Sequence, residues 1–501
     1  MRKHREKKFT EVRNTTFSLL LITLCLFNFS TSGLAQNTSS PYSRYGIGNL
    51  NPKNFGQSFA MGGTNIAMQN DSTPMFSINS NNPASYASLR LTTIELGVNY
   101  NREQLASTSS GKQAINTASL GYVALAFPFK KWWGSGIGLI PYSSVGYNVT
   151  DHQDIPNVGG VDYLYQGTGG INQIFFGNGF KPFYGLARMF LESKKYQELK
   201  EQKKDEEINR ILNRKKSWQN LSLGFNTSYL FGDIDHLQRS IFPYGSGYFN
   251  TRTGTSTRVS DIYFDYGAQY SYTFNSVKYH DRKDTLNPVK HRELKEKVKL
   301  LFGLTFAAQT NIHAKIDSLS YSYYNDAQGY ERQLDTMQNS TGTKGRITLP
   351  MSIGFGFGIK KGDKLLIAAD FAMQNWSSYQ AFNQDGGLKN SYRVSLGAQY
   401  VPNSKAGQGY YYKRLHYRAG ISYSQTALEL GTTQLSEKAV SAGIGFPVGR
   451  NYLLQTFSMI NVGVEYSMLG TTNNGLIQEN ILKVTFGFTM NDRWFVKPKF
   501  D

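Results

Sequence analysis

The chain has 501 residues, of which 14% are aromatic, 49 are glycine, 14 are proline and one is cysteine. Its formal net charge is +19 at pH 7 and its mean hydropathy is -0.43. One cysteine excludes a disulfide scaffold, and the composition fits either a secreted soluble β protein or an outer-membrane β-barrel, because only alternate residues of barrel strands face lipid.

The first 35 residues form a predicted secretory signal peptide. A basic start precedes the apolar run 17–29, and the small residues Gly33 and Ala35 stand before the expected cleavage point. The apolar run is too short to be a membrane anchor. Cys25 lies inside it with no small residue beside it, so a lipoprotein cleavage box is not indicated.

Cleavage would leave about 465 residues with a net charge of about +15. Export removes such a chain from cytoplasmic nucleic acid, so we expect no nucleic-acid partner. The excess of basic residues instead favours binding to anionic lipid headgroups or to an acidic partner.

Residues 36–90 are predicted to form a compact plug, or hatch. The segment is rich in Gly, Asn, Ser and Pro, a composition typical of turns. Alone it could not bury enough apolar surface to offset the entropy lost when it becomes ordered, so we expect another part of the chain to surround it.

Residues 91–492 are predicted to form an antiparallel barrel wall around the plug. Apolar and polar residues alternate with a period of two, for example over 456–468 and 480–491. We count fourteen such segments: 91–102, 115–129, 134–149, 169–181, 219–232, 259–276, 298–316, 345–360, 364–376, 390–402, 414–425, 436–447, 456–468 and 480–491.

A β-sandwich also alternates, but two features favour an all-β, membrane-spanning barrel. The apolar face is heavy in aromatic residues, as lipid-facing strands are. The polar face carries charges in mid-strand, which would face the lumen or the plug: Glu95, Asp265, Asp370, Arg393, Arg418, Glu465 and Lys483. The connections 150–168, 233–258 and 317–344 are expected outside the cell.

Asn82, Pro83 and Ala84 follow a glycine-rich stretch just before the first wall strand. This arrangement resembles the hatch of the FadL-type outer-membrane transporters. The resemblance implies a fourteen-stranded barrel with an N-terminal hatch that takes up long-chain fatty acids and other hydrophobic compounds, located in the outer membrane of a Gram-negative cell.

The third predicted strand contains Gly138 and Pro141. Proline cannot donate a ladder hydrogen bond, so Pro141 indicates a bulge or a gap. The resemblance implies a gap, because members of that family have a kinked third strand that opens the wall sideways; an ordinary bulge is the alternative.

Two inner connections depart from this pattern. Residues 181–217 and 278–298 are long and charged and are predicted to be helical periplasmic insertions, although Pro288 interrupts the second. Each is either a solvated decoration or a docking surface. Residues 493–501 are expected to form a periplasmic tail.

The sequence shows no sign of catalysis, metal binding or a cofactor. The six histidines of the mature chain have no metal-ligand spacing, and nucleotide and nucleophile motifs are missing. A lipase triad assembled from distant residues has nothing specific in its favour.

The leading hypothesis is passive uptake of a hydrophobic small molecule. Arg393 and Lys483 face inward and could meet a ligand carboxylate, or could pair with lumenal acids such as Glu465. The rival hypothesis is an accessory barrel of a secretion or outer-membrane assembly complex, which would dock a periplasmic or outer-membrane protein through the insertions.

Overall fold

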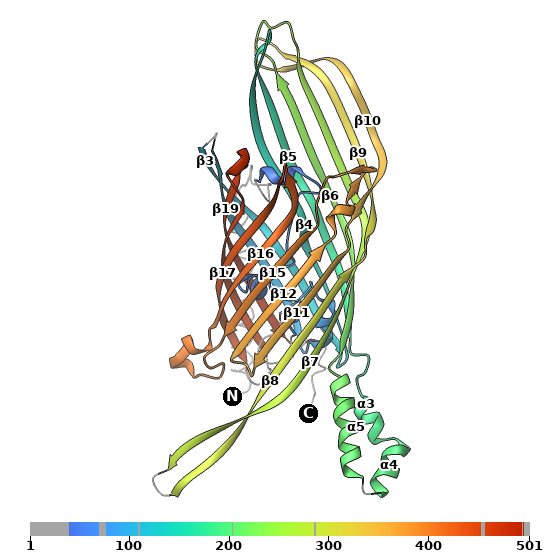
Figure 1. Ribbon diagram of the computed structural model, residues 1–501, viewed down its shortest axis with the longest axis vertical. Coiled ribbons are helices and arrows are strands. Elements are labelled where there is room, and N and C mark those ends of the chain that lie inside the picture. Colours follow the sequence, from blue (N-terminus) through green and yellow to red (C-terminus); the bar gives the residue numbers. More distant parts are fainter. Residues whose placement is uncertain are drawn as a thin grey trace, which may run out of the picture.

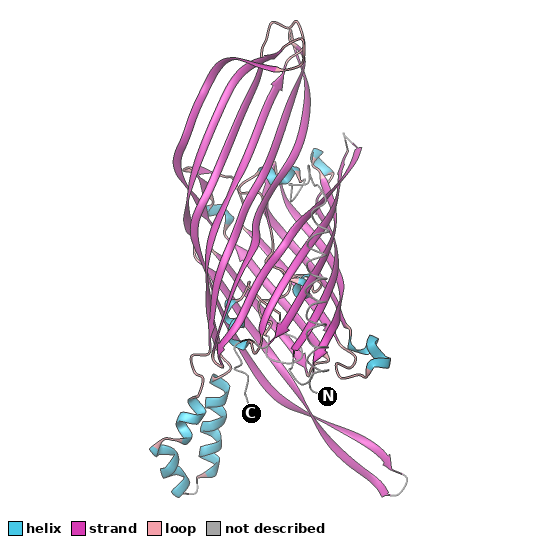
Figure 2. Cartoon of the chain, turned by 180° about the vertical axis from the view of Figure 1, so that it is seen from behind, coloured by secondary structure: helices cyan, strands magenta, loops and turns pink. Residues whose placement is uncertain are grey.

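The computed structural model describes residues 40–69, 77–108, 111–202, 204–284, 287–451, 456–492 and 494. The predicted signal peptide and most of the predicted C-terminal tail lie outside these ranges. Figure 1 shows an upright barrel with a tall extension at one end, and Figure 2 shows its opposite side.

Fourteen wall strands close into one antiparallel barrel, because the last strand pairs with the first from Gln478–Ala106 to Asp492–Thr92. The strands are β2 (Thr92–Ser107), β3 (Gly111–Lys130), β4 (Trp133–Ile155), β5 (Gly159–Phe180), β6 (Ser222–Ile241), β7 (Asn250–Asp284), β8 (Asn287–Ala307), β9 (Thr310–Asn325), β10 (Glu331–Leu349), β11 (Ser352–Lys361), β12 (Leu365–Gln374), β15 (Ser391–Tyr400), β16 (His416–Leu430), β17 (Thr433–Asn451), β18 (Thr456–Gly470) and β19 (Gln478–Asp492).

Two of the wall strands are each broken into two pieces. β8 and β9 both pair with β7, and β10 and β11 pair with β9 and β8 respectively, so each pair of pieces counts as one wall strand. All fourteen segments predicted from the alternation lie on wall strands, and the even count returns both ends of the wall to the same edge.

The alternation is explained by two different environments. On β18 and β19 the apolar residues Ile460, Tyr466 and Phe486 face outward and are exposed, whereas Asn461 and Gly487 face inward and are buried. An outward apolar band with an inward polar face is the pattern of a membrane barrel. The inward orientation predicted for the charged residues of the wall is confirmed below by their contacts.

The expected outer connections are largely strands, which corrects the prediction for 150–168, 233–258 and 317–344. β4 to β7, β9 and β10 continue well beyond the rest of the wall as a curved extension (Figure 1). Much of it is polar, for example 250–258 of β7, so the apolar alternation that marks the rest of the wall is weak there. Each added residue pair extends a ladder that the wall has already begun, and the strands therefore propagate.

A helical unit follows β5 at the end opposite the extension, as predicted for 181–217. It consists of α3 (Leu186–Leu191), α4 (Lys194–Glu201) and α5 (Asp205–Trp218). We expected its thin apolar stripe to need the barrel or a partner. Instead Phe190, Leu199 and Ile208 bury one another between the three helices, so the unit has its own small core.

The second predicted helical insertion is wrong. Residues 278–284 and 287–298 continue the pairing of β7 with β8, from Lys278–Leu294 to Asp284–Asn287, and Figure 1 shows this hairpin projecting at the same end as the helical unit. Pro288 stands near the start of β8, where the ladder shifts register between Arg282–Lys290 and Asp284–Asn287, because proline has no N–H to donate.

The remaining elements are short. They are η1 (Pro41–Arg44), β1 (Asn49–Leu50), α2 (Gly56–Phe59), η2 (Pro83–Ser88), η3 (Trp376–Ser378), β13 (Gln380–Ala381), β14 (Gln384–Asp385), η4 (Gln408–Arg414) and η5 (Asn473–Gly475). Among the helices in the described ranges, none has the length and apolar character needed to cross a membrane.

Phe486→Arg should strongly reduce assembly of the barrel into membranes. Phe486 is 50% exposed on the outward face of β19, and an arginine facing lipid near the bilayer centre costs about 2–4 kcal/mol. The matched control is Leu319→Arg, at a 41% exposed outward position of the extension. Heat-modifiable migration of membrane fractions on gels measures assembly. Equal losses for the two variants would contradict a lipid-facing Phe486.

Candidate functional site

The described N-terminal residues, 40–69 and 77–91, fill the inside of the barrel and are called the N-terminal segment below. Most of them are buried, and Figure 1 shows their short elements enclosed by the wall. The position agrees with the predicted plug over 36–90. The candidate site is the contact surface between this segment and the wall.

Asn82 fastens the segment to two wall strands. Its side-chain amide donates to the carbonyl oxygens of Ile66 at 2.8 Å, Ala268 at 3.2 Å and Leu304 at 3.3 Å. Its Oδ1 accepts from the backbone N–H of Ala84 and so caps η2. The side chain is fully buried, so its amide is a structural clamp.

Pro83 and Ala84 pack directly on wall glycines. A Cβ at Gly224 would lie 2.4 Å from the carbonyl carbon of Pro83 and 2.5 Å from the nitrogen of Ala84. A Cβ at Gly179 would lie 2.7 Å from the Pro83 oxygen. Contacts under 3.0 Å are not sustained by real side chains, so these wall positions require glycine.

Inward glycines on most wall strands do the same for the rest of the segment. Their Cβ positions would meet atoms of Phe59, Ala60, Met61, Gly62, Ile66, Ala67, Asn82 or Tyr86 of the segment, whereas at Gly97 and Gly487 the nearest atoms belong to Tyr122 of β3. We call this set the glycine belt: Gly97, Gly134, Gly136, Gly177, Gly179, Gly224, Gly267, Gly303, Gly356, Gly397, Gly420, Gly443, Gly463 and Gly487.

Many members of the belt are direct cross-strand partners. Gly134 pairs with Gly179, which pairs with Gly224, which pairs with Gly267. The sequence reasoning treated these residues only as members of the polar face. The available signal was their recurrence at inward positions of nearly every strand.

Buried carboxylates of the wall bind backbone N–H groups of the segment. Asp370 accepts from Asn65 at 2.6 Å and from Ile66 at 2.9 Å, and Glu95 accepts from Ile78 at 3.0 Å. These hydrogen bonds offset part of the cost of burying a polar side chain. Two charges predicted to face the plug, Glu95 and Asp370, therefore hold it.

Asp265 and Arg418 complete the buried polar contacts. Asp265 forms an ion pair with Lys53 of the segment, with 2.8 Å between Oδ2 and Nζ. Arg418 instead contacts other wall residues, Gln399 at 2.8 Å and Asn461 at 2.7 Å. Asp265 thus belongs to the segment's attachment, and Arg418 to the wall's internal network.

Arg393 and Lys483 are also directed at the segment. An Arg393 Nη2 donates to the Gly62 carbonyl oxygen at 3.3 Å and to Ser422 at 2.9 Å. The Lys483 ammonium lies 5.5 Å from the centre of the Phe59 ring, and Lys483 is the cross-strand partner of Glu465. Both cations are therefore engaged in the closed arrangement seen here.

The wall is not hydrogen-bonded all round. β3 and β4 pair only from Lys130–Trp133 to Val123–Leu139. Beyond that point β3 continues to Gly111 paired only with β2, and β4 continues to Ile155 paired with β5. We call this unpaired stretch, between 111–122 and 140–155, the seam.

Gly138 and Pro141 stand where the seam begins. Gly138 is opposite Ala124 in the last part of the β3–β4 ladder, and a Cβ there would lie 2.7 Å from the Val123 oxygen. Pro141 lies just beyond the ladder, and the β4–β5 register shifts between Pro141 and Ser143. Both alternatives predicted from the sequence for Pro141 are therefore present: a bulge in its pairing with β5, and the absence of pairing with β3.

The N-terminal segment covers the free edge of β4. β1 pairs antiparallel with it, Asn49 opposite Ser144 and Leu50 opposite Ser143, and the Asn51 N–H donates to the Tyr142 oxygen at 2.9 Å. An unpaired strand edge readily accepts another strand. The segment therefore adds a short strand to the edge of β4 at Ser143 and Ser144.

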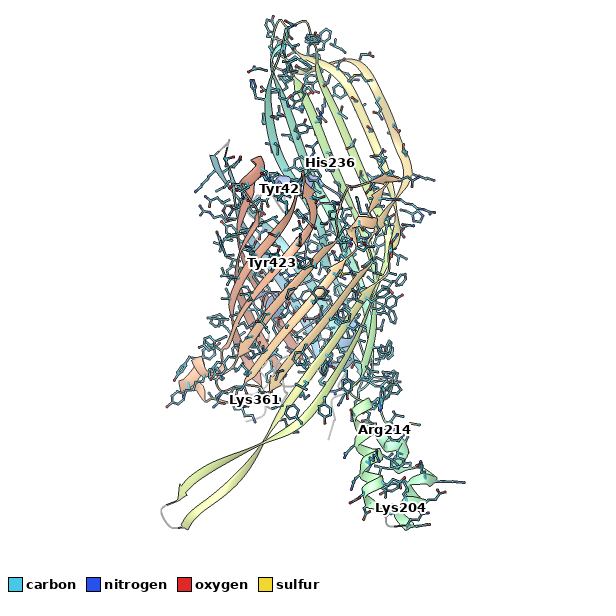
Figure 3. The ribbon with its side chains drawn as sticks, viewed as in Figure 1. Tyr42, Lys204, Arg214, His236, Lys361 and Tyr423 are labelled. Atoms are coloured by element: carbon cyan, nitrogen blue, oxygen red, sulfur yellow. The ribbon has the colours of Figure 1, made fainter. Side chains whose placement is uncertain are left out.

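An apolar cluster lies above the segment, toward the extension. Ile47 packs there with residues of many strands, including Val145, Tyr263, Trp376 and Tyr379. Tyr147 borders this cluster, and its hydroxyl lies 2.7 Å from His236 Nδ1. Burial and the nearby Arg44 guanidinium lower the pKa of His236, so the imidazole is neutral at pH 7. Tyr42 and His236 are labelled in Figure 3.

Within the described ranges, no three His, Cys, Asp or Glu residues are grouped as metal ligands. The buried polar groups instead pair the segment with the wall. Their arrangement attaches the N-terminal segment to the wall, next to the edge of β4 that β3 leaves unpaired.

A protein-family model described as BamG matches residues 17–187 and 285–501, which is well over half of the chain. The unmatched part runs from within α3 into the described end of β7. No curated protein matches the chain.

Solved structures align over most of the chain at low identity. A CymD monoaromatic hydrocarbon channel is 12% identical, covering 90% of this chain and 99% of that one, with a TM-score of 0.45. The toluene transporter TodX of P. putida is 12% identical, covering 89% and 100%, with a TM-score of 0.48. A TodX deletion mutant is 13% identical, covering 87% and 98%, with a TM-score of 0.49. None reaches 0.5, so the fold rests on the strand topology above.

Gly303→Val should displace the N-terminal segment while the barrel still assembles. A Cβ at Gly303 would lie 2.2 Å from the Ile66 oxygen, and overpacking typically costs about 1–3 kcal/mol. Gly254→Val on β7 is the control, because its nearest neighbours are 4.0 Å away. Limited proteolysis in detergent should cut within 40–91 only in the first variant. Equal protection of both would contradict the role of the belt.

Proposed function

The chain belongs to the BamG family, and from its geometry we propose that it is an outer-membrane barrel that passes hydrophobic small molecules sideways through the seam. One observation carries the proposal: β3 and β4 part at Val123–Leu139, and among the described residues it is the N-terminal segment that pairs with the free edge of β4, at Ser143 and Ser144. The segment would serve as the hatch.

The placement in the outer membrane follows from the outward face. Exposed apolar and aromatic side chains surround the wall, for example Phe176, Phe264, Phe355, Phe371 and Leu396. Membrane barrels have short periplasmic turns and longer outer connections. The end with the tight β3–β4 and β11–β12 turns is then periplasmic, and the extension faces outside. Cleavage of a signal peptide over 1–35 belongs to the same proposal.

The seam would open toward lipid in the outer half of the wall. Phe55, Tyr122, Ile140 and Phe175 form part of a buried apolar cluster beside it, with the Phe55 and Tyr122 rings stacked at 4.1 Å. The Tyr122 hydroxyl accepts from the Gly56 N–H at 2.9 Å. A shift of the segment would break this bond and expose an apolar path to the bilayer.

The ligand class follows from this lining. An apolar chain could pack against the apolar side chains beside the seam, and a carboxylate could pair with Arg393 once the shift removed its bond to Gly62. A long-chain fatty acid satisfies both conditions. Asn82, Pro83 and Ala84 would set the resting position of the hatch, and Gly138 and Pro141 the lower end of the opening.

Asn49→Cys with Ser144→Cys should abolish uptake when oxidised and restore it when reduced. The two residues are antiparallel partners, whose Cα separation of about 4.5–5.5 Å suits a disulfide. The bond would fix the segment on the β4 edge. Uptake of labelled oleate by cells expressing the variant, with and without reductant, measures the effect.

Thr251→Cys with Ser322→Cys is the matched control, because these partners join β7 and β9 in the extension. It should form a disulfide without affecting uptake. Transport that continues with the first disulfide fully formed would exclude movement of β1 from the seam as the gating step.

A second candidate is an accessory barrel of a secretion or outer-membrane assembly complex. The observation in its favour is that two projections, the helical unit and the β7–β8 hairpin, extend from the same end (Figure 2). The helical unit presents Met189, Leu191 and Trp218 in exposed positions, with 65% of Met189 accessible. A periplasmic protein partner would bind there.

Replacing residues 183–216 with a Gly-Asn turn should leave the barrel assembled, because the unit has its own core. If the second candidate is correct, proteins that co-purify with the native chain in a native pull-down should disappear, as measured by mass spectrometry. If every partner is retained, the helical unit does not bind a partner protein and the second candidate is wrong. Loss of oleate uptake in this variant would instead connect the unit to transport.

A further inference from the structure

Basic side chains gather at the short-turn end of the barrel. The β3–β4 turn carries Lys130 and Lys131, and the β11–β12 turn at 360–364 carries three lysines and one aspartate. The β15–β16 connection at 401–415 carries Lys405, Lys413 and Arg414 without an acidic residue. We call these groups, with Arg90, the basic rim. Figure 3 places Lys361 at this end, near the level where the helical unit begins.

Several rim cations lie over aromatic rings. Lys130 Nζ is 5.4 Å from the centre of the Trp132 ring, and Lys364 Nζ is 5.8 Å from that of Tyr400. Lys413 Nζ is 4.4 Å from the Tyr410 ring. Tyr400 and Tyr410 are exposed. Tryptophan and tyrosine mark the level of lipid headgroups in membrane proteins, so the rim cations stand at that level.

At the opposite end of the molecule, in the extension, several cations form ion pairs with carboxylates. In the extension Arg252 is 3.3 Å from Glu331, Arg258 is 2.8 Å from Asp233 and Arg332 is 2.8 Å from Asp326. Those charges neutralise one another in pairs. The rim turns instead carry more basic than acidic residues, so the positive potential of this chain is concentrated where the wall meets the inner leaflet.

We infer that the basic rim binds the anionic headgroups of inner-leaflet phospholipids, such as phosphatidylglycerol. The rim groups lie at three turns of the wall, β3–β4, β11–β12 and β15–β16, at the level expected for headgroups, and several of their cations lie over aromatic rings. Basic residues near a membrane surface attract anionic lipid additively. The inference rests on the membrane placement proposed above, but not on the passage of a ligand through the seam.

The test uses the purified barrel in vesicle-derived nanodiscs of phosphatidylcholine with one-fifth phosphatidylglycerol. The protein is re-extracted with mild detergent, and the retained lipids are measured by native mass spectrometry. The rim variant is Lys130→Gln, Lys131→Gln and Lys364→Gln. The control is Lys112→Gln, Lys315→Gln and Lys344→Gln, three exposed lysines at the other end.

The native chain and the control should retain phosphatidylglycerol several-fold above its share of the bilayer, and the rim variant should retain it in proportion. The native enrichment should also fall as sodium chloride rises from 0.05 to 0.5 M, because salt screens exposed charges.

Equal enrichment in the rim variant and the native chain, or equal loss in the control, would overturn the inference. So would a native chain without enrichment whose rim substitutions remove a co-purifying protein, since that result assigns the rim to a protein partner. Enrichment in a chain that fails the oleate assay would keep the inference and reject the proposed transport.

Discussion

The close approach of the N-terminal segment's backbone to the wall is the constraint on which the rest of the structure depends. A wall strand normally directs a side chain inward at every second position, and those side chains would keep the segment several ångströms away. Glycine at positions such as Gly303, Gly397 and Gly420 removes that barrier, since each Cβ would lie within 2.3 Å of a segment atom. The belt exchanges side-chain packing for direct contact between backbones.

Direct backbone contact brings polar groups into the interior, and they must be paired there. Asp370, Glu95 and Asn82 supply these partners from the wall and the segment. A segment held by many hydrogen bonds at fixed distances is well placed to cover one specific edge. The same fit places β1 beside β4, where Asn49 and Leu50 pair with Ser144 and Ser143.

The wall could be predicted from the sequence because one physical rule determines it: a strand between lipid and lumen must alternate. The strand number and the inward charges followed from that rule. The extension and the hairpin at 278–298 could not be predicted in this way, because their sequences lack the regular apolar–polar alternation of the wall, as in 250–258 of β7, where every residue is polar or glycine. The small core of Phe190, Leu199 and Ile208 was missed because the segment was treated as a single helix, whereas two turns bring the three residues together.

The contacts of the candidate site were harder to predict than its location. Pro141 indicated a defect in the wall, and the break in the β3–β4 ladder is beside it. The engagement of Arg393 with the Gly62 oxygen required the three-dimensional position of the segment, since 331 residues separate the two in sequence. The glycines were visible in the sequence, but their common purpose depends on strand register.

Residue-resolved amide hydrogen exchange with and without oleate tests the central claim most directly. If the N-terminal segment uncovers the seam when a hydrophobic ligand binds, amides in 49–51 and 142–146 should lose protection on addition of oleate, whereas those of the β18–β19 ladder should not change. Unchanged protection at the β4 edge, at oleate concentrations that saturate binding, would contradict the account.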